Sequence, residues 1–137
     1  MILDTSALLR ALLSDQRQHT PCAEVLAASR SRVLSPFVLA ELDYLITRSA
    51  GVAGEIALLD EVGRGAYELA HFSELDVAAA SEIIAQYSDL GIGLADASVV
   101  ILAGERETRD IFTLDERHFR ALRAADGRPF RLLPADR

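Results

Sequence analysis

Short apolar segments that alternate with helical patterns constrain the fold of this chain most strongly. Such segments are centred on residues 1–3, 32–35 and 110–114. Each is too short for a helix and contains adjacent apolar residues, as in strands that are buried on both faces of a sheet. Because helical patterns lie between these segments, the sequence predicts an open α/β fold with a parallel sheet that helices cover on both sides.

Helical patterns fill most of the remaining chain. They cover residues 7–13, 21–30, 36–48, 54–62, 76–87 and 95–105, with a short turn or helix at 116–123, and further strands are expected at 67–72 and 129–133. No linker, repeat or low-complexity segment divides the chain. With 137 residues, half of them apolar, we expect one domain that spans residues 1–137.

The charged residues exclude several classes of function. All 14 basic residues are arginines, so a Walker A phosphate loop, a Schiff-base enzyme and a lysine general base are ruled out. The net charge of −7 argues against a simple nucleic-acid clamp. A lone Cys22 excludes a disulfide framework, and neither a targeting segment nor a membrane-spanning run is evident, so we expect a cytoplasmic protein.

Four acidic residues stand out by their positions. Asp4 and Asp115 follow predicted strands, and the carboxyl ends of parallel strands meet at one edge of a sheet. Glu41 lies three residues after Val38, and we expect it on the apolar face of its helix. Asp96 opens a very apolar helix, in the first turn, where the helix dipole favours negative charge.

Acids gathered in this way repel one another unless a cation neutralises them. At an effective dielectric constant near 20, one like-charge pair about 4 Å apart costs roughly 4 kcal/mol. Oxygen-only ligands suit Mg²⁺ or Mn²⁺ better than zinc, and such ions activate water for attack on phosphate esters.

Four segments in order resemble a known family. They are residues 1–7, 35–42, 94–100 and 111–119. Together they resemble PIN-domain ribonucleases, and specifically the VapC toxins of VapBC toxin–antitoxin pairs. The resemblance covers essentially the whole chain. It implies a three-layer sandwich in which a short, mainly parallel central sheet is flanked by helices.

The resemblance also implies a site and a reaction. An Mg²⁺- or Mn²⁺-dependent endoribonuclease is expected, in which a metal-activated hydroxide attacks an RNA phosphodiester. The acidic residues that match the family's metal and catalytic positions are Asp4, Glu41, Asp96 and Asp115. Two hydroxyl residues, Ser6 and Thr113, match positions that line the pocket. Asp4 and Asp96 are expected as the strongest ligands, and Glu41 as a second ligand or a group that orients water.

Partners follow from the same resemblance. The implied substrate is RNA, and the implied regulator is a VapB-like antitoxin whose tail brings a basic side chain to the acidic pocket. A homodimer is also expected. Arg117, Arg120 and Arg123 would lie on one side of a helix and could touch RNA, although a solvated basic face is the simpler explanation.

Other interpretations stay open. Asp4, Asp96 and Asp115 could each be a helix cap or turn residue, and Glu41 a surface residue. A catalytically inactive PIN-like module could bind a basic peptide through its acidic pocket. A haloacid-dehalogenase-like phosphatase would need a second aspartate where Ser6 lies. None of the three histidines has a second histidine at ligand spacing, so no histidine is expected in the site.

Overall fold

A parallel sheet forms the centre of the molecule. The computed structural model describes residues 1–15 and 17–137. The strands are β1 (Ile2–Leu3), β2 (Val33–Leu34), β3 (Glu68–Leu69), β4 (Asp110–Phe112) and β5 (Arg131–Leu133). Their order is β3-β2-β1-β4-β5, and every neighbouring pair is parallel. The predicted sheet is therefore confirmed.

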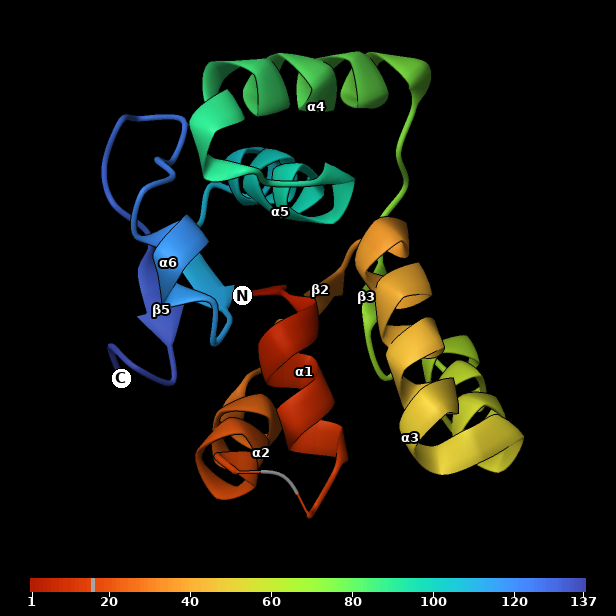
Figure 1. Cartoon of the computed structure of the whole chain (residues 1–137). Helices are drawn as coiled ribbons and strands as arrows, with labels where there is room; N and C mark the ends of the chain where they lie inside the picture. Colours follow the sequence, from red (N-terminus) through yellow and green to blue (C-terminus); the bar gives the residue numbers. More distant parts are fainter. Residues whose placement is uncertain (16) are drawn as a thin grey trace.

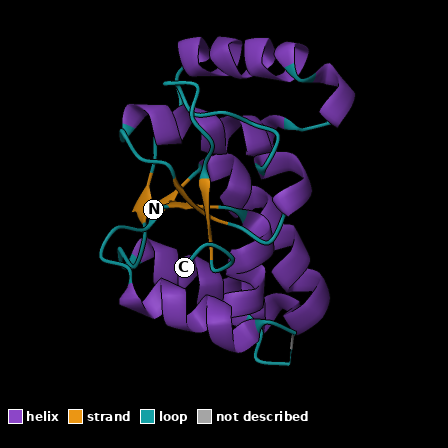
Figure 2. Cartoon of the chain, turned by 90° about the vertical axis from the view of Figure 1, so that its left-hand side faces the viewer, coloured by secondary structure: helices purple, strands orange, loops and turns teal. Residues whose placement is uncertain are grey.

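Helices cover the sheet on two sides (Figures 1 and 2). They are α1 (Thr5–Leu12), α2 (His19–Ala28), α3 (Pro36–Gly63), α4 (Glu74–Gln86), α5 (Leu94–Glu105) and the short α6 (Glu116–Phe119), with a 3₁₀ turn, η1, at Ser88–Leu90. In Figure 1, α1 and α2 lie below the sheet, whereas α5 lies above it with α4 stacked on its outer side. This layering confirms the predicted sandwich.

The central strands β1 and β2 are short and are buried on both faces. Ile2, Leu3 and Leu34 are fully buried, and Val33 is 2% exposed. Both residues of β3 are exposed, as befits the edge of a sheet. The expected strand at residues 67–72 is therefore reduced to Glu68–Leu69.

Helix α3 joins two predicted helices across a break. Gly51, in the middle of α3, has φ 67° and ψ −170°, a conformation that favours glycine, and the chain folds back there (Figure 1). At the start of α3, Ser35 caps the helix by accepting a hydrogen bond from the Phe37 N–H at 3.1 Å. The Ser35 hydroxyl also lies 2.7 Å from the buried Ser98 hydroxyl, and this contact ties α3 to α5 beside the carboxyl edge of the sheet.

The buried side of α3 differs from the predicted one. Val38, Leu42 and Ile46 are buried at four-residue spacing, and Glu41 is exposed. Among the helices that the structure describes, none combines the length and the apolar character that a membrane crossing requires.

Candidate active site

The ends of two adjacent strands begin the site. β1 ends at Leu3 and β4 at Phe112, and the backbone N–H of Asp4 donates to the Phe112 carbonyl at 2.9 Å. This pairing holds Asp4 beside Thr113, although 109 positions separate them in the sequence. The parallel sheet thus brings the two predicted strand-end acids, Asp4 and Asp115, to one edge.

Two hydroxyls hold the Asp4 carboxylate. Its Oδ2 accepts hydrogen bonds from Ser6 Oγ at 2.6 Å and from Thr113 Oγ1 at 2.7 Å. Ser6 Oγ in turn accepts from the Leu114 N–H at 2.9 Å. Asp4 is only 4% exposed, and this burial raises its pKa while the two hydroxyl bonds oppose the rise. Asp4 also caps α1, because its side chain accepts from the Ser6 N–H.

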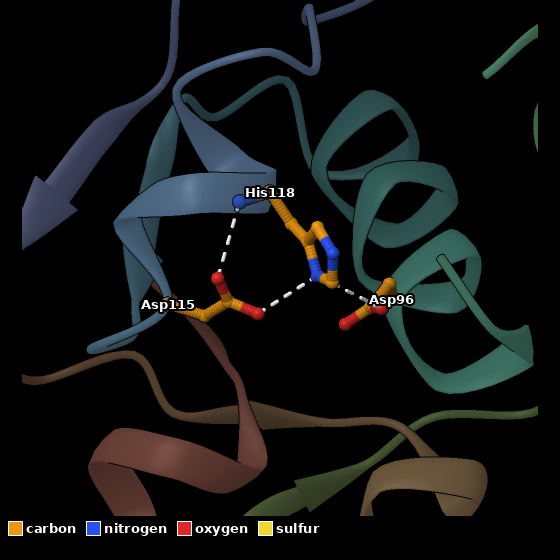
Figure 3. A group of neighbouring side chains, drawn as sticks. All are labelled: Asp96, Asp115 and His118. Atoms are coloured by element: carbon orange, nitrogen blue, oxygen red, sulfur yellow. Dashed lines mark hydrogen bonds and ion pairs between the residues drawn. The ribbon is translucent and has the colours of Figure 1, made fainter. Parts of the chain in front are cut away.

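Asp115 is fixed by its own backbone surroundings. Its N–H donates to Thr113 Oγ1 at 2.9 Å, and its Oδ1 accepts from the His118 N–H at 3.1 Å, which makes it the N-cap of α6. Thr113 therefore links Asp115 to Asp4 through one hydroxyl. The second carboxylate oxygen of Asp115 remains directed toward His118 and Asp96 (Figure 3).

Asp96 approaches the same point from α5. It is the third residue of that helix, and its Oδ2 accepts from the Gly93 N–H at 3.3 Å. His118 Nδ1 lies 2.8 Å from Asp115 Oδ2 and 3.8 Å from Asp96 Oδ2. One ligand atom from each of these three residues falls within 4.8 Å of the others, so the group has the size of a metal site.

The acids of the site lack arginine partners. No ion pair of the described chain joins an arginine to Asp4, Asp96 or Asp115. Burial raises the pKa of Asp96 to about 6, and the charge of Asp4 adds to the rise, while the Gly93 N–H and His118 oppose it. Asp4 is not a member of the group formed by Asp96, Asp115 and His118, but its charge acts on Asp96, and the Thr113 hydroxyl connects it to Asp115. A divalent cation would relieve the accumulated negative charge.

Other candidate residues lie differently from the expectation. Glu41 is exposed on α3 and is not part of the group formed by Asp96, Asp115 and His118. Arg117 is exposed on α6. Arg120 is held by Glu116 and by Asp136, with its guanidinium 2.7 Å from both oxygens of Asp136. Because α6 ends at Phe119, the three arginines do not share one helix.

Sequence reasoning did not expect His118 in the group. The chain has no second histidine at ligand spacing, but the group in the structure combines two carboxylates with one imidazole. A signal was nonetheless present: His118 follows Asp115 by three residues, and residues at that spacing share a helix face.

Comparison with known proteins decides the family. The sequence pattern of the PIN domain family matches residues 1–125. The chain belongs to the PIN-domain family. Within this family it is 44% identical to ribonuclease VapC26 of Mycobacterium tuberculosis, over 98% of this chain and 100% of that relative. The predicted resemblance to VapC-type PIN domains is thus confirmed.

Two solved structures share the fold. Mycobacterium tuberculosis VapC20, a Sarcin-Ricin loop cleaving toxin, superposes with a TM-score of 0.77 at 16% identity, over 83% of this chain and 88% of that one. VapBC2 from Rickettsia felis, solved with a DNA fragment from its promoter, gives a TM-score of 0.62 at 22% identity, over 86% and 89%.

Proposed function

We propose that this PIN-domain protein is an endoribonuclease toxin that hydrolyses RNA phosphodiester bonds with Mg²⁺ or Mn²⁺ and is inhibited by a cognate VapB-type antitoxin. The observation that carries the proposal is the convergence of Asp96 and Asp115 beside the buried Asp4, with no arginine to neutralise them in the described chain. The similarity to ribonuclease VapC26 over nearly the whole chain supports the reaction.

The donor atoms of the site fit a divalent cation. Asp4, Asp96 and Asp115 would hold it, because their carboxylates are unpaired by arginine and are fixed by hydrogen bonds from Thr113, Ser6 and backbone N–H groups. When bound, such an ion lowers the pKa of water and stabilises negative charge on phosphate. Ser6 and Thr113 line the pocket and hold Asp4 in one orientation, so that its carboxylate would stay directed toward the cation.

Glu41 is assigned a role at the solvent side of the site. The helix that carries it begins directly after β2, at the same carboxyl edge where Asp4 and Asp115 lie. Its exposed carboxylate suits a second ion or a water molecule better than the buried pocket. We expect Glu41→Gln to raise the Mg²⁺ concentration needed for half-maximal RNA cleavage, whereas folding stays unchanged. An unchanged metal requirement would remove Glu41 from the site.

The partners follow from the chemistry of the pocket. RNA brings phosphates to the cation, and Arg117, exposed on α6, is the better placed of the two candidate arginines to contact them, since Arg120 is already paired. A VapB-type antitoxin would bring a basic side chain to the same acids. The similarity to the VapBC2 structure supports an antitoxin partner, and the acidic pocket favours a basic side chain. We further propose a cytoplasmic homodimer in which residues 1–137 form one nuclease domain.

The alternative is an inactive PIN-like module that only binds a basic peptide through its acidic pocket. The presence of all four acidic residues that match the family argues against this alternative. One assay distinguishes the nuclease from the binding module. Purified protein is incubated with structured RNAs and Mg²⁺ or Mn²⁺, with and without EDTA. We expect cleavage that EDTA stops and that Asp96→Asn abolishes. The matched control, Asp60→Asn on the exposed surface of α3, should cleave like wild type. Folded protein that cleaves no RNA in either metal would support the binding module.

A further inference from the structure

The imidazole of His118 occupies a ligand position among the acids. Nδ1 is buried, and within the described part of the chain it has no hydrogen-bond partner. Asp115 Oδ2 is only 2.8 Å away, but its direction does not meet hydrogen-bond geometry. A buried polar atom without a partner is costly, so the structure leaves Nδ1 in need of one. Figure 3 shows the ring between the Asp115 and Asp96 carboxylates.

The two separations from His118 Nδ1 are close to those in the coordination shell of one ion. Octahedral ligands at 2.0–2.1 Å from a metal lie about 2.9 Å apart when adjacent and about 4.2 Å apart when opposite. His118 Nδ1 is 2.8 Å from Asp115 Oδ2, close to the adjacent value. Its distance of 3.8 Å from Asp96 Oδ2 lies between the two values, so a small rotation of Asp96 suffices.

The local backbone keeps this arrangement in place. Asp115 Oδ1 is bonded to the His118 N–H, so the cap of α6 orients the other oxygen, Oδ2, toward the ring. The His118 side chain is 19% exposed, and that of Asp96 is 21% exposed, so the ligand atoms lie just inside the surface, where an ion can enter.

We infer that His118 binds the divalent cation through Nδ1, together with Asp96 and Asp115, and that this nitrogen ligand makes the site prefer Mn²⁺ to Mg²⁺. Mg²⁺ takes oxygen ligands and retains its water, whereas transition ions accept imidazole readily. The inference rests on the metal site of the proposed function and adds a ligand and a selectivity to it.

A purely positional role for His118 makes a different prediction. If the ring only steadied Asp115, its loss would weaken Mn²⁺ and Mg²⁺ binding alike, and no nitrogen would touch the ion. The test must therefore detect the nitrogen itself and compare the two metals.

Pulsed EPR of the full-length protein loaded with Mn²⁺ detects a directly bound nitrogen. We expect a histidine nitrogen coupling in wild type that changes when the protein is grown with ¹⁵N-histidine. The coupling should vanish in His118→Ala and His118→Gln. His71→Ala, which removes an exposed histidine elsewhere, is the matched control and should keep the coupling.

Calorimetry with Mn²⁺ or Mg²⁺ alone completes the test. His118→Ala should weaken Mn²⁺ binding about tenfold or more, and Mg²⁺ binding much less. His118→Gln, which retains a polar group, keeps the comparison valid if the alanine variant folds poorly. Mn²⁺ binding without histidine coupling, or equal losses for both metals, would overturn the inference and leave the nuclease intact. Failure of wild type to bind either metal would contradict both the inference and the proposed function.

Discussion

Aspartates in two regions of this molecule meet opposite electrostatic surroundings. At the C-terminal end of the chain, the Arg120 guanidinium and the Leu132 N–H bind Asp136 and lower its pKa to about 2. In the site, burial and the charge of Asp4 raise the pKa of Asp96 to about 6. The same residue type is neutralised by the protein in one region and left in need of a cation in the other.

The difference shows how a chain with 14 arginines retains a cation site. In the described ion pairs, arginines bind Glu24, Glu68, Asp110, Glu116 and Asp136, and none binds Asp4, Asp96 or Asp115. The acids at the carboxyl edge are instead held by hydroxyls and backbone N–H groups. Those groups are neutral, so they fix the carboxylates without removing their charge.

The largest effect is expected from removing a charge in the site. Asp4→Asn keeps an oxygen that can accept from Ser6 and Thr113 but loses the charge that binds the ion. We expect RNA cleavage to fall on the order of 100-fold or more. The melting temperature in EDTA should rise, because burial raises the pKa of Asp4 and its ionised form destabilises the metal-free fold. A lower melting temperature in EDTA would contradict this account of Asp4.

A smaller loss of RNA cleavage is expected when Asp4 keeps its charge but loses a hydrogen bond that orients it. Thr113→Val deletes the hydroxyl that donates to Asp4 and accepts from the Asp115 N–H, with little change in volume. We expect Mn²⁺ affinity and RNA cleavage to fall about tenfold. Thr47→Val, on α3, is a matched control that should leave both measurements unchanged. Equal behaviour of the two variants would show that the hydroxyl network does not orient the site.

Protons should compete with metal for Asp96. With a pKa of about 6, this carboxyl is mostly protonated at pH 5 and mostly ionised at pH 7, so Mn²⁺ affinity should rise roughly tenfold over that interval. In EDTA the sign for stability is opposite. The pKa of Asp96 in the folded state exceeds its unfolded value of 3.8, so the proton of Asp96 binds more tightly to the folded protein. Protonated Asp96 therefore contributes to the stability of the metal-free fold at low pH, and this contribution is lost as the pH rises through about 6. Calorimetry and thermal unfolding at both pH values test the two trends, and a pH-independent affinity would contradict them.

The smallest effect on stability and cleavage is expected at Asp136, which is paired with Arg120. Asp136→Asn weakens an exposed ion pair, so the free energy of unfolding should fall by about 1 kcal/mol or less, with RNA cleavage unchanged. Because the folded-state pKa of Asp136 is lowered to about 2, its contribution is present above pH 4 and is lost as the pH falls toward 2. A loss of cleavage comparable to that of Asp4→Asn would abolish the distinction between the two regions.

The sequence predicted the centre of the fold better than its margins. β1, β2 and β4 were recognisable because strands buried on both faces carry unbroken apolar runs. β3 is an exposed edge strand of two residues, and its limits depend on pairing with β2 rather than on its own pattern. The break at Gly51 separates α3 where the sequence predicted two helices, because a residue with positive φ cannot continue a helix.

Within the site, position along the strands was more informative than position around a helix. Asp4 and Asp115 could be paired from parallel topology alone. Glu41 was expected on the buried face because it follows Val38 by three residues. Leu42 lies at the centre of that face, and Glu41 is turned about 100° from it around the helix, so Glu41 is exposed. The three-residue spacing pointed from Asp115 to His118, but it could not show that Asp96, which belongs to a different helix, lies beside the same ring.

The central claim is that the acids at the carboxyl edge, which no arginine of the described ion pairs binds, hold the metal. Anomalous diffraction from crystals soaked in Mn²⁺ tests it most directly, because the signal locates the ion among the side chains. The account predicts a peak in contact with Asp96 and Asp115, next to Asp4, that disappears in Asp96→Asn crystals. A peak elsewhere, such as beside Asp43 and Glu55 on α3, with the carboxyl edge empty, would contradict it.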